Sequence, residues 1–142
     1  MTVELFVGEI DFWGQAKGLG DTMGAIDAQL TLVVDGCRVF SEEMPVLELA
    51  YRLWQWTNEG LLRDEDFEFK SMSIDGTDWF WIRKFGDRWR LGSRWQYRAC
   101  MALHTEGEIR AIIDDYREHV RNEVLAQLSL DVGWIVGLRS GG

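Results

Sequence analysis

The chain has few of the residues that build metal and catalytic sites: two cysteines and two histidines among 142 residues. Cys37 and Cys100 lie far apart, whereas a disulfide framework or a zinc site needs more ligands at closer spacing. We therefore expect two buried free thiols in a reducing cytoplasm. His104 and His119 have no serine motif, cysteine partner or spaced ligand set nearby, which favours ordinary surface histidines. The sequence predicts no catalytic residue, no cofactor and no metal ion, and we expect no enzymatic activity.

The chain also lacks long apolar runs and contains a single proline. No run approaches the roughly 20 apolar residues that span a bilayer. No basic segment precedes an apolar stretch near the N-terminus, so we expect no signal peptide. These absences predict a cytoplasmic protein that makes no membrane contact.

Apolar and aromatic residues are abundant. They make up 46% and 13% of the chain, and eight residues are tryptophan, which excludes a disordered chain. The length is most simply that of one domain with a sizeable core. We expect residues 1–142 to form a single globular domain, and the sequence leaves its oligomeric state open.

Charge is distributed unevenly along the chain, whose net charge is -9. Residues 1–80 hold 5 Lys/Arg and 16 Asp/Glu, whereas residues 81–142 hold 10 and 8. An acidic first half repels phosphate backbones and attracts basic partners. Nucleic acid is therefore not the expected partner.

Alternating apolar residues predict a first strand over 3–12 and a β-hairpin over 28–40. Asp35-Gly36 lies between apolar runs and predicts a two-residue turn of type I′. Such a turn gives the hairpin one apolar core face. The predicted pairs are Val34 with Cys37 and Leu32 with Val39.

Two helices are predicted, over about 44–59 and 106–128. Ser41 is the expected N-cap of the first helix, and Glu42 and Glu43 favour the positive end of its dipole. Apolar residues at helical spacing give each helix one buried face. The predicted fold is α+β: an antiparallel β-meander sheet with both helices packed on one face.

Acidic residues cluster on both sides of the first helix. Glu42 and Glu43 precede it, and Asp64, Glu65 and Asp66 follow it. Helix-start and loop charges of this kind commonly serve solubility. The alternative is that the two clusters form one negative surface.

Residues 79–98, WFWIRKFGDRWRLGSRWQYR, combine basic and aromatic side chains. Turn signals at Asp75-Gly76 and Gly86-Asp87 predict two hairpins. The predicted pairs are Glu68 with Arg83, Arg83 with Arg90, Trp81 with Gly92 and Trp79 with Arg94. Alternation then places most of the aromatic residues on a core face. That face contains Phe67, Phe69, Phe80, Ile82, Trp89, Leu91 and Trp95.

The opposite face of these hairpins collects Glu68, Lys70, Met72, Trp79, Trp81, Arg83, Arg88, Arg90 and Arg94. We expect Trp81 to cover the bare backbone at the opposing glycine. One interpretation is that these residues shield one another or are covered by a helix. The other is a binding platform, where a guanidinium–indole contact contributes roughly 0.5–1 kcal/mol if exposed.

The hairpin Val34-Asp35-Gly36 and the strand Trp89–Gln96, WRLGSRWQ, resemble those of a group of uncharacterised bacterial domains. Overall the chain resembles the small, acidic, single-domain immunity proteins of bacterial polymorphic toxin systems. The resemblance implies a non-enzymatic inhibitor that binds a cognate, basic toxin domain and occludes its active site. The alternative is a nucleic-acid or acidic-ligand binding module. The expected partner-binding residues are Glu42, Glu43, Asp64, Glu65, Asp66, Trp79, Trp81, Arg83, Arg90 and Arg94.

Overall fold

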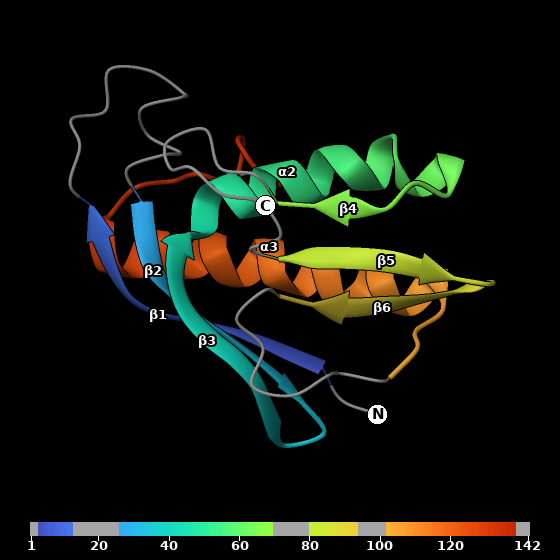
Figure 1. Ribbon diagram of the computed structural model, residues 1–142. Helices are drawn as coiled ribbons and strands as arrows, with labels where there is room; N and C mark the ends of the chain where they lie inside the picture. The colour runs from blue at the N-terminus through green and yellow to red at the C-terminus, as the bar shows by residue number, and fades with distance from the viewer. Residues whose placement is uncertain (1–2, 13–25, 70–79, 94–101, 139–142) are drawn as a thin grey trace.

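The computed structural model describes residues 3–12, 26–69, 80–93 and 102–138. These residues form an α+β fold with two antiparallel three-stranded sheets and two α-helices (Figure 1). The prediction of an antiparallel meander with two helices is confirmed, with the strands divided between two sheets. None of the described helices is long and apolar enough to cross a membrane.

The first sheet contains β1 (Val3–Phe12), β2 (Ile26–Val34) and β3 (Cys37–Pro45), in that order. The apolar residues of β2 alternate onto one buried face, as a half-buried strand requires. Asp35 and Gly36 connect β2 to β3 with φ angles of 50° and 79°. A type I′ turn needs positive φ at both of its central residues. The predicted Asp-Gly hairpin is therefore confirmed.

The hairpin register contains a bulge that the sequence did not reveal. The pair next to the turn forms as predicted, but Leu32 lies opposite Phe40 instead of Val39. The extra residue lets both Val39 and Phe40 enter the core. Cys37 lies beside the turn at the end of the sheet and is exposed, so the prediction of a buried thiol there is wrong. Cys100 lies outside the described residues.

The first helix starts later than predicted. Strand β3 continues past Ser41 to Pro45, and α2 (Val46–Asn58) begins directly after it. Ser41 lies opposite Thr31 in the ladder, and their hydroxyl groups are 2.7 Å apart in a hydrogen bond. The prediction of Ser41 as the N-cap is therefore wrong, because its hydroxyl hydrogen-bonds across the sheet instead of to the helix. Proline, which lacks an N–H, ends the ladder and precedes the helix.

The second sheet follows η1 (Leu61–Arg63), a short 3₁₀ turn after α2. It contains β4 (Phe67–Glu68), β5 (Trp81–Phe85) and β6 (Arg88–Gly92) in sequence order. Both predicted pairs between β5 and β6 form. The described part of the predicted core face is buried. Its members are Phe67, Phe69, Phe80, Ile82, Trp89 and Leu91.

The β4–β5 register differs from the prediction by two residues. Glu68 lies opposite Trp81 instead of Arg83. The predicted turn at Asp75-Gly76 and the predicted pair Trp79–Arg94 lie outside the described residues, as does Trp95. A two-residue shift keeps every side chain on its predicted face, which is why the core assignment survives the error.

The second helix, α3 (Glu106–Leu128), has the predicted bounds and begins with a capping box. The Thr105 hydroxyl accepts the Glu108 N–H at 3.2 Å, and the Glu108 carboxylate accepts the Thr105 N–H at 3.3 Å. The helix contacts α2, β1 and β6, so it joins the two sheets (Figure 1). Its buried face consists of Ile109, Ile113, Tyr116, Val120 and Val124.

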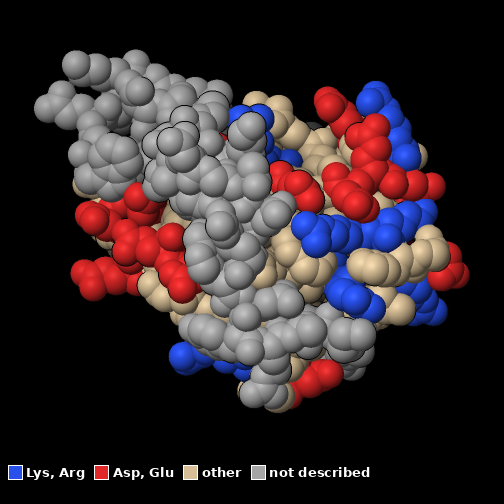
Figure 2. All heavy atoms as spheres, in the orientation of Figure 1, with Lys and Arg blue, Asp and Glu red and all other residues tan. Residues whose placement is uncertain are grey.

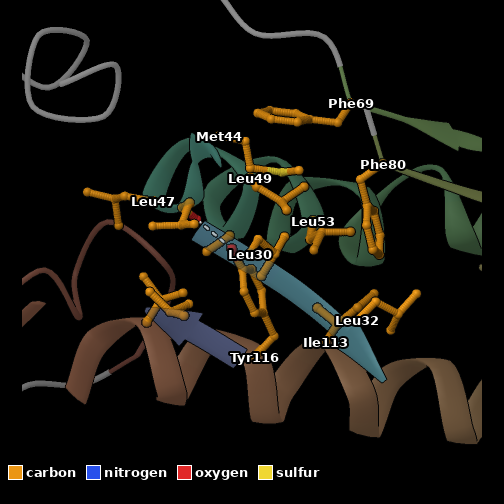
Figure 3. Packing of buried hydrophobic residues seen from close by; sticks show 14 of the residues in the cluster. Leu30, Leu32, Met44, Leu47, Leu49, Leu53, Phe69, Phe80, Ile113 and Tyr116 are labelled. Carbon is orange, nitrogen blue, oxygen red and sulfur yellow. Dashed lines mark hydrogen bonds between the residues drawn. The ribbon is translucent and has the colours of Figure 1, made fainter. Parts of the chain in front are cut away.

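The core lies between the first sheet and both helices, where leucines of β2 and α2 meet side chains of α3 (Figure 3). Tyr116 reaches from α3 toward the start of α2 and donates its hydroxyl to the carbonyl of Val46 at 2.8 Å. Complete burial raises the pKa of the Tyr116 phenol well above its ordinary value. This hydrogen bond satisfies a polar atom that the core would otherwise leave without water.

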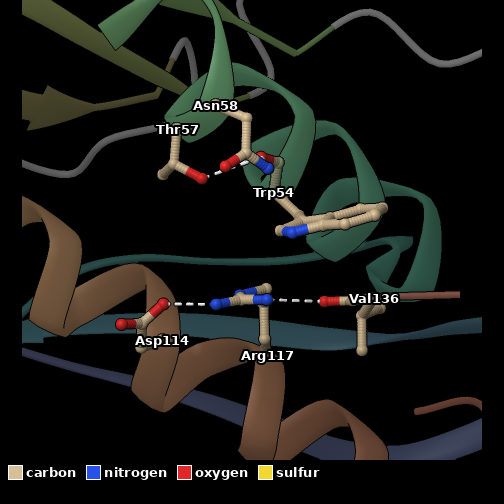
Figure 4. Close-up of polar contacts among 6 residues, drawn as sticks. All are labelled: Trp54, Thr57, Asn58, Asp114, Arg117 and Val136. Carbon is tan, nitrogen blue, oxygen red and sulfur yellow. Dashed lines mark hydrogen bonds and ion pairs between the residues drawn. The ribbon is translucent and has the colours of Figure 1, made fainter. Parts of the chain in front are cut away.

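The segment after α3, residues 129–138, folds back onto both helices. Arg117 of α3 donates to the carbonyl of Val136 at 2.7 Å and pairs with Asp114 (Figure 4). The indole of Trp54 on α2 covers Gly137 so closely that a Cβ there would overlap the ring. Three apolar residues of the segment are buried, so it is part of the core. They are Val132, Ile135 and Val136.

Candidate functional site

The Trp/Arg face consists of Trp81, Arg83 and Arg90 on β5 and β6. Trp81 covers Gly92 as predicted and is only 9% exposed. The Arg83 guanidinium lies 4.2 Å from the centre of the Trp81 ring, and Arg90 lies 4.3 Å from that of Phe85. Proteins that bind single-stranded nucleic acid use open aromatic faces on which the bases stack. Here the described aromatic faces already contact guanidinium groups and backbone.

The loop after η1 brings acidic side chains to this same face. Asp64 pairs with the Lys84 ammonium at 2.5 Å, and Asp66 accepts the Lys84 backbone N–H at 2.8 Å. Arg83 pairs with Glu68 at 3.1 Å. Figure 2 shows the result as acidic and basic side chains interleaved over the second sheet. The Trp/Arg face and the acidic loop therefore form one surface whose charges largely cancel.

The two predicted acidic clusters are not brought together. Glu42 and Glu43 lie on β3, before α2, and Glu43 is exposed opposite Gln29. Glu65, in the loop beyond α2, is exposed and pairs with Arg63 at 4.0 Å. The 13 residues of α2 separate the clusters by about 20 Å. Trp79 and Arg94, the other two predicted partner-binding residues, lie outside the described part of the chain.

A second acidic group lies on the first sheet, and sequence reasoning missed most of it. We call Glu9, Asp11 and Glu43 the acidic sheet surface: all three are exposed, on β1 and β3. Asp11 lies opposite Asp27 and Glu43 lies opposite Gln29, two residues apart on β2, so their backbones are about 12 Å apart. No Lys or Arg of the described residues pairs with any of the three. Figure 2 shows acidic side chains gathered over this end of the first sheet.

The alternation in VELFVGEIDF contained the signal for this surface, because a strand with one apolar face turns its carboxylates to the other. These carboxylates do not form a run of adjacent acidic residues, which is the pattern that marks an acidic cluster in a sequence. Carboxylates that are separated along the chain come together only across strands. Their proximity therefore needs the β1–β2–β3 register, which the sequence did not supply in full.

The two histidines differ from each other. His104 is 1% exposed, so the prediction of a surface histidine is wrong. Its N–H and carbonyl both hydrogen-bond Trp89 at 2.8 Å, and this bridge turns the imidazole inward. The Nδ1 atom lies 3.6 Å from Glu108, whose pKa is lowered chiefly by the backbone hydrogen bond from Thr105. His119, half-buried, accepts the Val7 N–H at 3.1 Å.

Metal chemistry has no candidate site within the described residues. No group of three or more His, Cys, Asp and Glu side chains there lies in an arrangement that holds a metal ion. What the described surface offers is a charge pattern: a neutralised Trp/Arg face on one sheet and unpaired carboxylates on the other. Such a pattern is suited to recognising a partner by charge.

Comparison with known families finds a match of unknown function. The family described as "Domain of unknown function (DUF7878)" matches residues 13–126, most of the chain. Neither the curated proteins nor the solved structures contain a match to this chain.

Proposed function

The chain belongs to the DUF7878 family of domains of unknown function, and we propose that it is a non-enzymatic inhibitor of a protein partner. In this proposal it is an immunity protein that neutralises a cognate, basic toxin domain by covering its active site. The resemblance of the sequence to small acidic immunity proteins motivates the identity of the partner. The charge distribution on the folded chain supports the expectation that the partner is positively charged.

One observation carries the proposal: the acidic sheet surface presents three exposed carboxylates on one end of the first sheet. Glu9, Asp11 and Glu43 are exposed and have no cationic partner among the described residues. The cations of β5, in contrast, are paired: Lys84 with Asp64 and Arg83 with Glu68. With a net charge of -9, the chain attracts a basic surface over long range. Such steering raises association rates and disfavours partners of the wrong charge.

The alternative, a nucleic-acid or acidic-ligand binding module, has less support from the described residues. Its binding face would be the Trp/Arg face, where Arg83 is bonded to Glu68 and stacked on Trp81. Nucleic-acid affinity comes largely from cations that neutralise phosphates. Cations that already pair with carboxylates in the same fold contribute little to nucleic-acid affinity.

The test is co-expression with the product of the adjacent gene in a bacterial host. If the neighbour is a toxin, its expression alone should arrest growth, and co-expression of this chain should restore it. The purified pair should form a one-to-one complex, with the toxin's activity lost in proportion to the inhibitor added. Absence of both protection and complex formation would overturn the proposal.

The structure supplies a matched pair of variants for this complex. Reversal of Glu9, Asp11 and Glu43 to Lys should slow association by about ten-fold or more at low salt. The control reverses Glu59, Asp87 and Glu118, which are also exposed but lie elsewhere. Both triple variants change the net charge equally. Equal slowing by the two would mean that the acidic sheet surface has no special role.

A further inference from the structure

Half of the outer edge of β1 is covered by side chains of α3. His119 accepts the Val7 N–H at 3.1 Å, and the Gln127 carbonyl accepts the Ile10 N–H at 2.7 Å. The Gln127 amide also donates to the Gly8 carbonyl at 3.2 Å. Three backbone groups that a neighbouring strand would otherwise satisfy are thus bonded to the helix. Covering an edge in this way prevents it from pairing with other chains.

The other half of the same edge lacks this cover. In a regular antiparallel ladder, alternate residues point their N–H and C=O groups the same way. Because the Val7 N–H points outward, those of Val3 and Leu5 do so too along the regular pairing from Val3 to Val7. No described residue outside β1 and β2 hydrogen-bonds the backbone of either. Within the described sheet β1 is an edge strand.

A groove lies beside this uncovered edge. Two cavities of about 220 Å³ and 320 Å³ open between the first residues of β1 and the first half of α3. Both are lined by Val3, Glu4, Ile112 and Asp115, so they form one continuous depression, the β1–α3 groove. The strand and the helix diverge toward the start of each, as Figure 1 shows. The groove therefore results from the crossing of the two elements.

The groove is acidic. Its walls contain the carboxylates of Glu4, Asp115 and Glu108, and no Lys or Arg of the described residues lines it. Glu4 and Asp115 are exposed and form no ion pair within the described structure. His104, in the wall of the larger cavity, buries an Nε2 atom that has no hydrogen-bond partner in the described structure. The carboxylates of the walls favour an occupant that brings positive charge.

We propose that the β1–α3 groove is the docking site for an extended, basic segment of a protein partner. The segment adds as a strand beside Val3 and Leu5, whose backbone groups give it affinity. Alternate side chains of an added strand point into the adjacent pockets, and Lys or Arg there reaches Glu4 and Asp115. This inference deepens the proposed inhibitor function, on which it rests for the nature of the partner.

The test uses a synthetic peptide of about eight residues with alternating Lys and Val, long enough for one strand. Fluorescence anisotropy of the labelled peptide should show saturable binding that weakens with added salt. The double variant Glu4→Gln/Asp115→Asn should weaken binding about five-fold or more, since both acceptor charges are lost. Glu118→Gln, an exposed carboxylate of α3 outside the groove, is the control and should leave binding unchanged.

Amide hydrogen exchange tests strand addition directly. Bound peptide should slow exchange at Val3 and Leu5, while Val7 and Ile10, already bonded to α3, should change little. Equal binding of an alternating Glu–Val peptide, unchanged exchange at Val3 and Leu5, or no binding at all would each overturn the proposal. Protection of these amides without peptide, accompanied by dimers in sedimentation, would assign the edge to a second copy of this chain instead.

The two proposals fail separately. A cognate toxin that binds the Glu4→Gln/Asp115→Asn variant as tightly as the wild type would overturn the groove and leave the inhibitor function standing. If the peptide binds in the groove but the chain protects against no neighbouring gene product, the inhibitor function is overturned and the groove stands.

Discussion

The indole of Trp81 lies directly on Gly92, its partner across the β5–β6 ladder. A Cβ at position 92 would overlap the six-membered ring of that indole. The contact helps to explain how a tryptophan on the charged side of a sheet is only 9% exposed. Arg83 covers the ring from its own side.

Gly92→Ala should lower the free energy of unfolding by about 1–3 kcal/mol, because the indole has to move or the strand has to shift. Chemical denaturation measures the change. Gly107→Ala is the matched control: it lies in α3, where a Cβ would make only an ordinary contact with Thr105, and should stabilise the protein by roughly 0.5–1 kcal/mol. A neutral Gly92→Ala would mean that the indole does not rest on the strand in solution.

Gly36→Val should also destabilise the fold, for a different reason. The φ of 79° at Gly36 lies in the left-handed region, which costs a side-chain-bearing residue about 1–2 kcal/mol and a β-branched one more. The space around its Cβ is open, so no clash contributes. Gly36→Asn should be much better tolerated, since asparagine adopts this conformation readily. Equal thermal midpoints for both variants would contradict the type I′ turn.

Tyr116 makes a prediction about alkaline pH. Burial raises the pKa of its phenol in the folded state above the unfolded value, so its neutral form favours folding below about pH 10. That contribution is lost as the pH rises above the unfolded value toward the folded one. Tyr116→Phe should be about 1 kcal/mol less stable near neutral pH, because Val46 loses its hydrogen bond. Its stability should then fall less steeply above pH 10 in urea titrations.

The two acidic clusters should respond differently to charge reversal. Asp64→Lys/Asp66→Lys removes both contacts to Lys84 and should cost about 1 kcal/mol of stability. Glu42→Lys/Glu43→Lys should leave stability within about 0.5 kcal/mol, since neither side chain pairs with a described cation. Chemical denaturation of both double variants at the same ionic strength gives the two changes in the free energy of unfolding. Similar losses in both would show that the Asp64–Lys84 pairing is absent in solution.

Nucleic acid should bind weakly or not at all. We expect no salt-sensitive binding to single- or double-stranded DNA or RNA at physiological salt, because the net charge of -9 opposes it. Filter binding and anisotropy are sufficient measurements. Micromolar binding that weakens steeply with salt and is lost in Trp79→Ala would favour the binding-module alternative.

Sequence reasoning succeeded where one local rule was decisive. The Asp35-Gly36 turn needs positive φ, and the alternation of apolar residues around Trp81 assigns faces whatever the register. The bounds of α3 followed from apolar residues at helical spacing. These features depend on residues that are close together in the chain.

Sequence reasoning failed where a side chain has one possible partner nearby in the chain and another that is distant in the sequence. Ser41 has the chemistry of a helix cap, but Thr31 offers its hydroxyl a partner in the sheet. The local sequence around His104 indicates an exposed loop histidine, but the pairing of its backbone with Trp89 turns the side chain inward. The acidic sheet surface and the β1–α3 groove likewise exist only once separate elements pack together. No local pattern encodes which of two such partners is nearer.

The bonds between β1 and α3 also bear on how the chain folds as it is made. His119 and Gln127 hydrogen-bond β1 across separations of 112 to 119 residues. A growing chain cannot form these bonds until His119 and Gln127 have been synthesised, so the edge of β1 stays open until then. Long-range contacts of this kind slow folding, and open strand edges invite aggregation meanwhile. The yield of folded protein should therefore depend on translation speed and on chaperones that bind nascent chains.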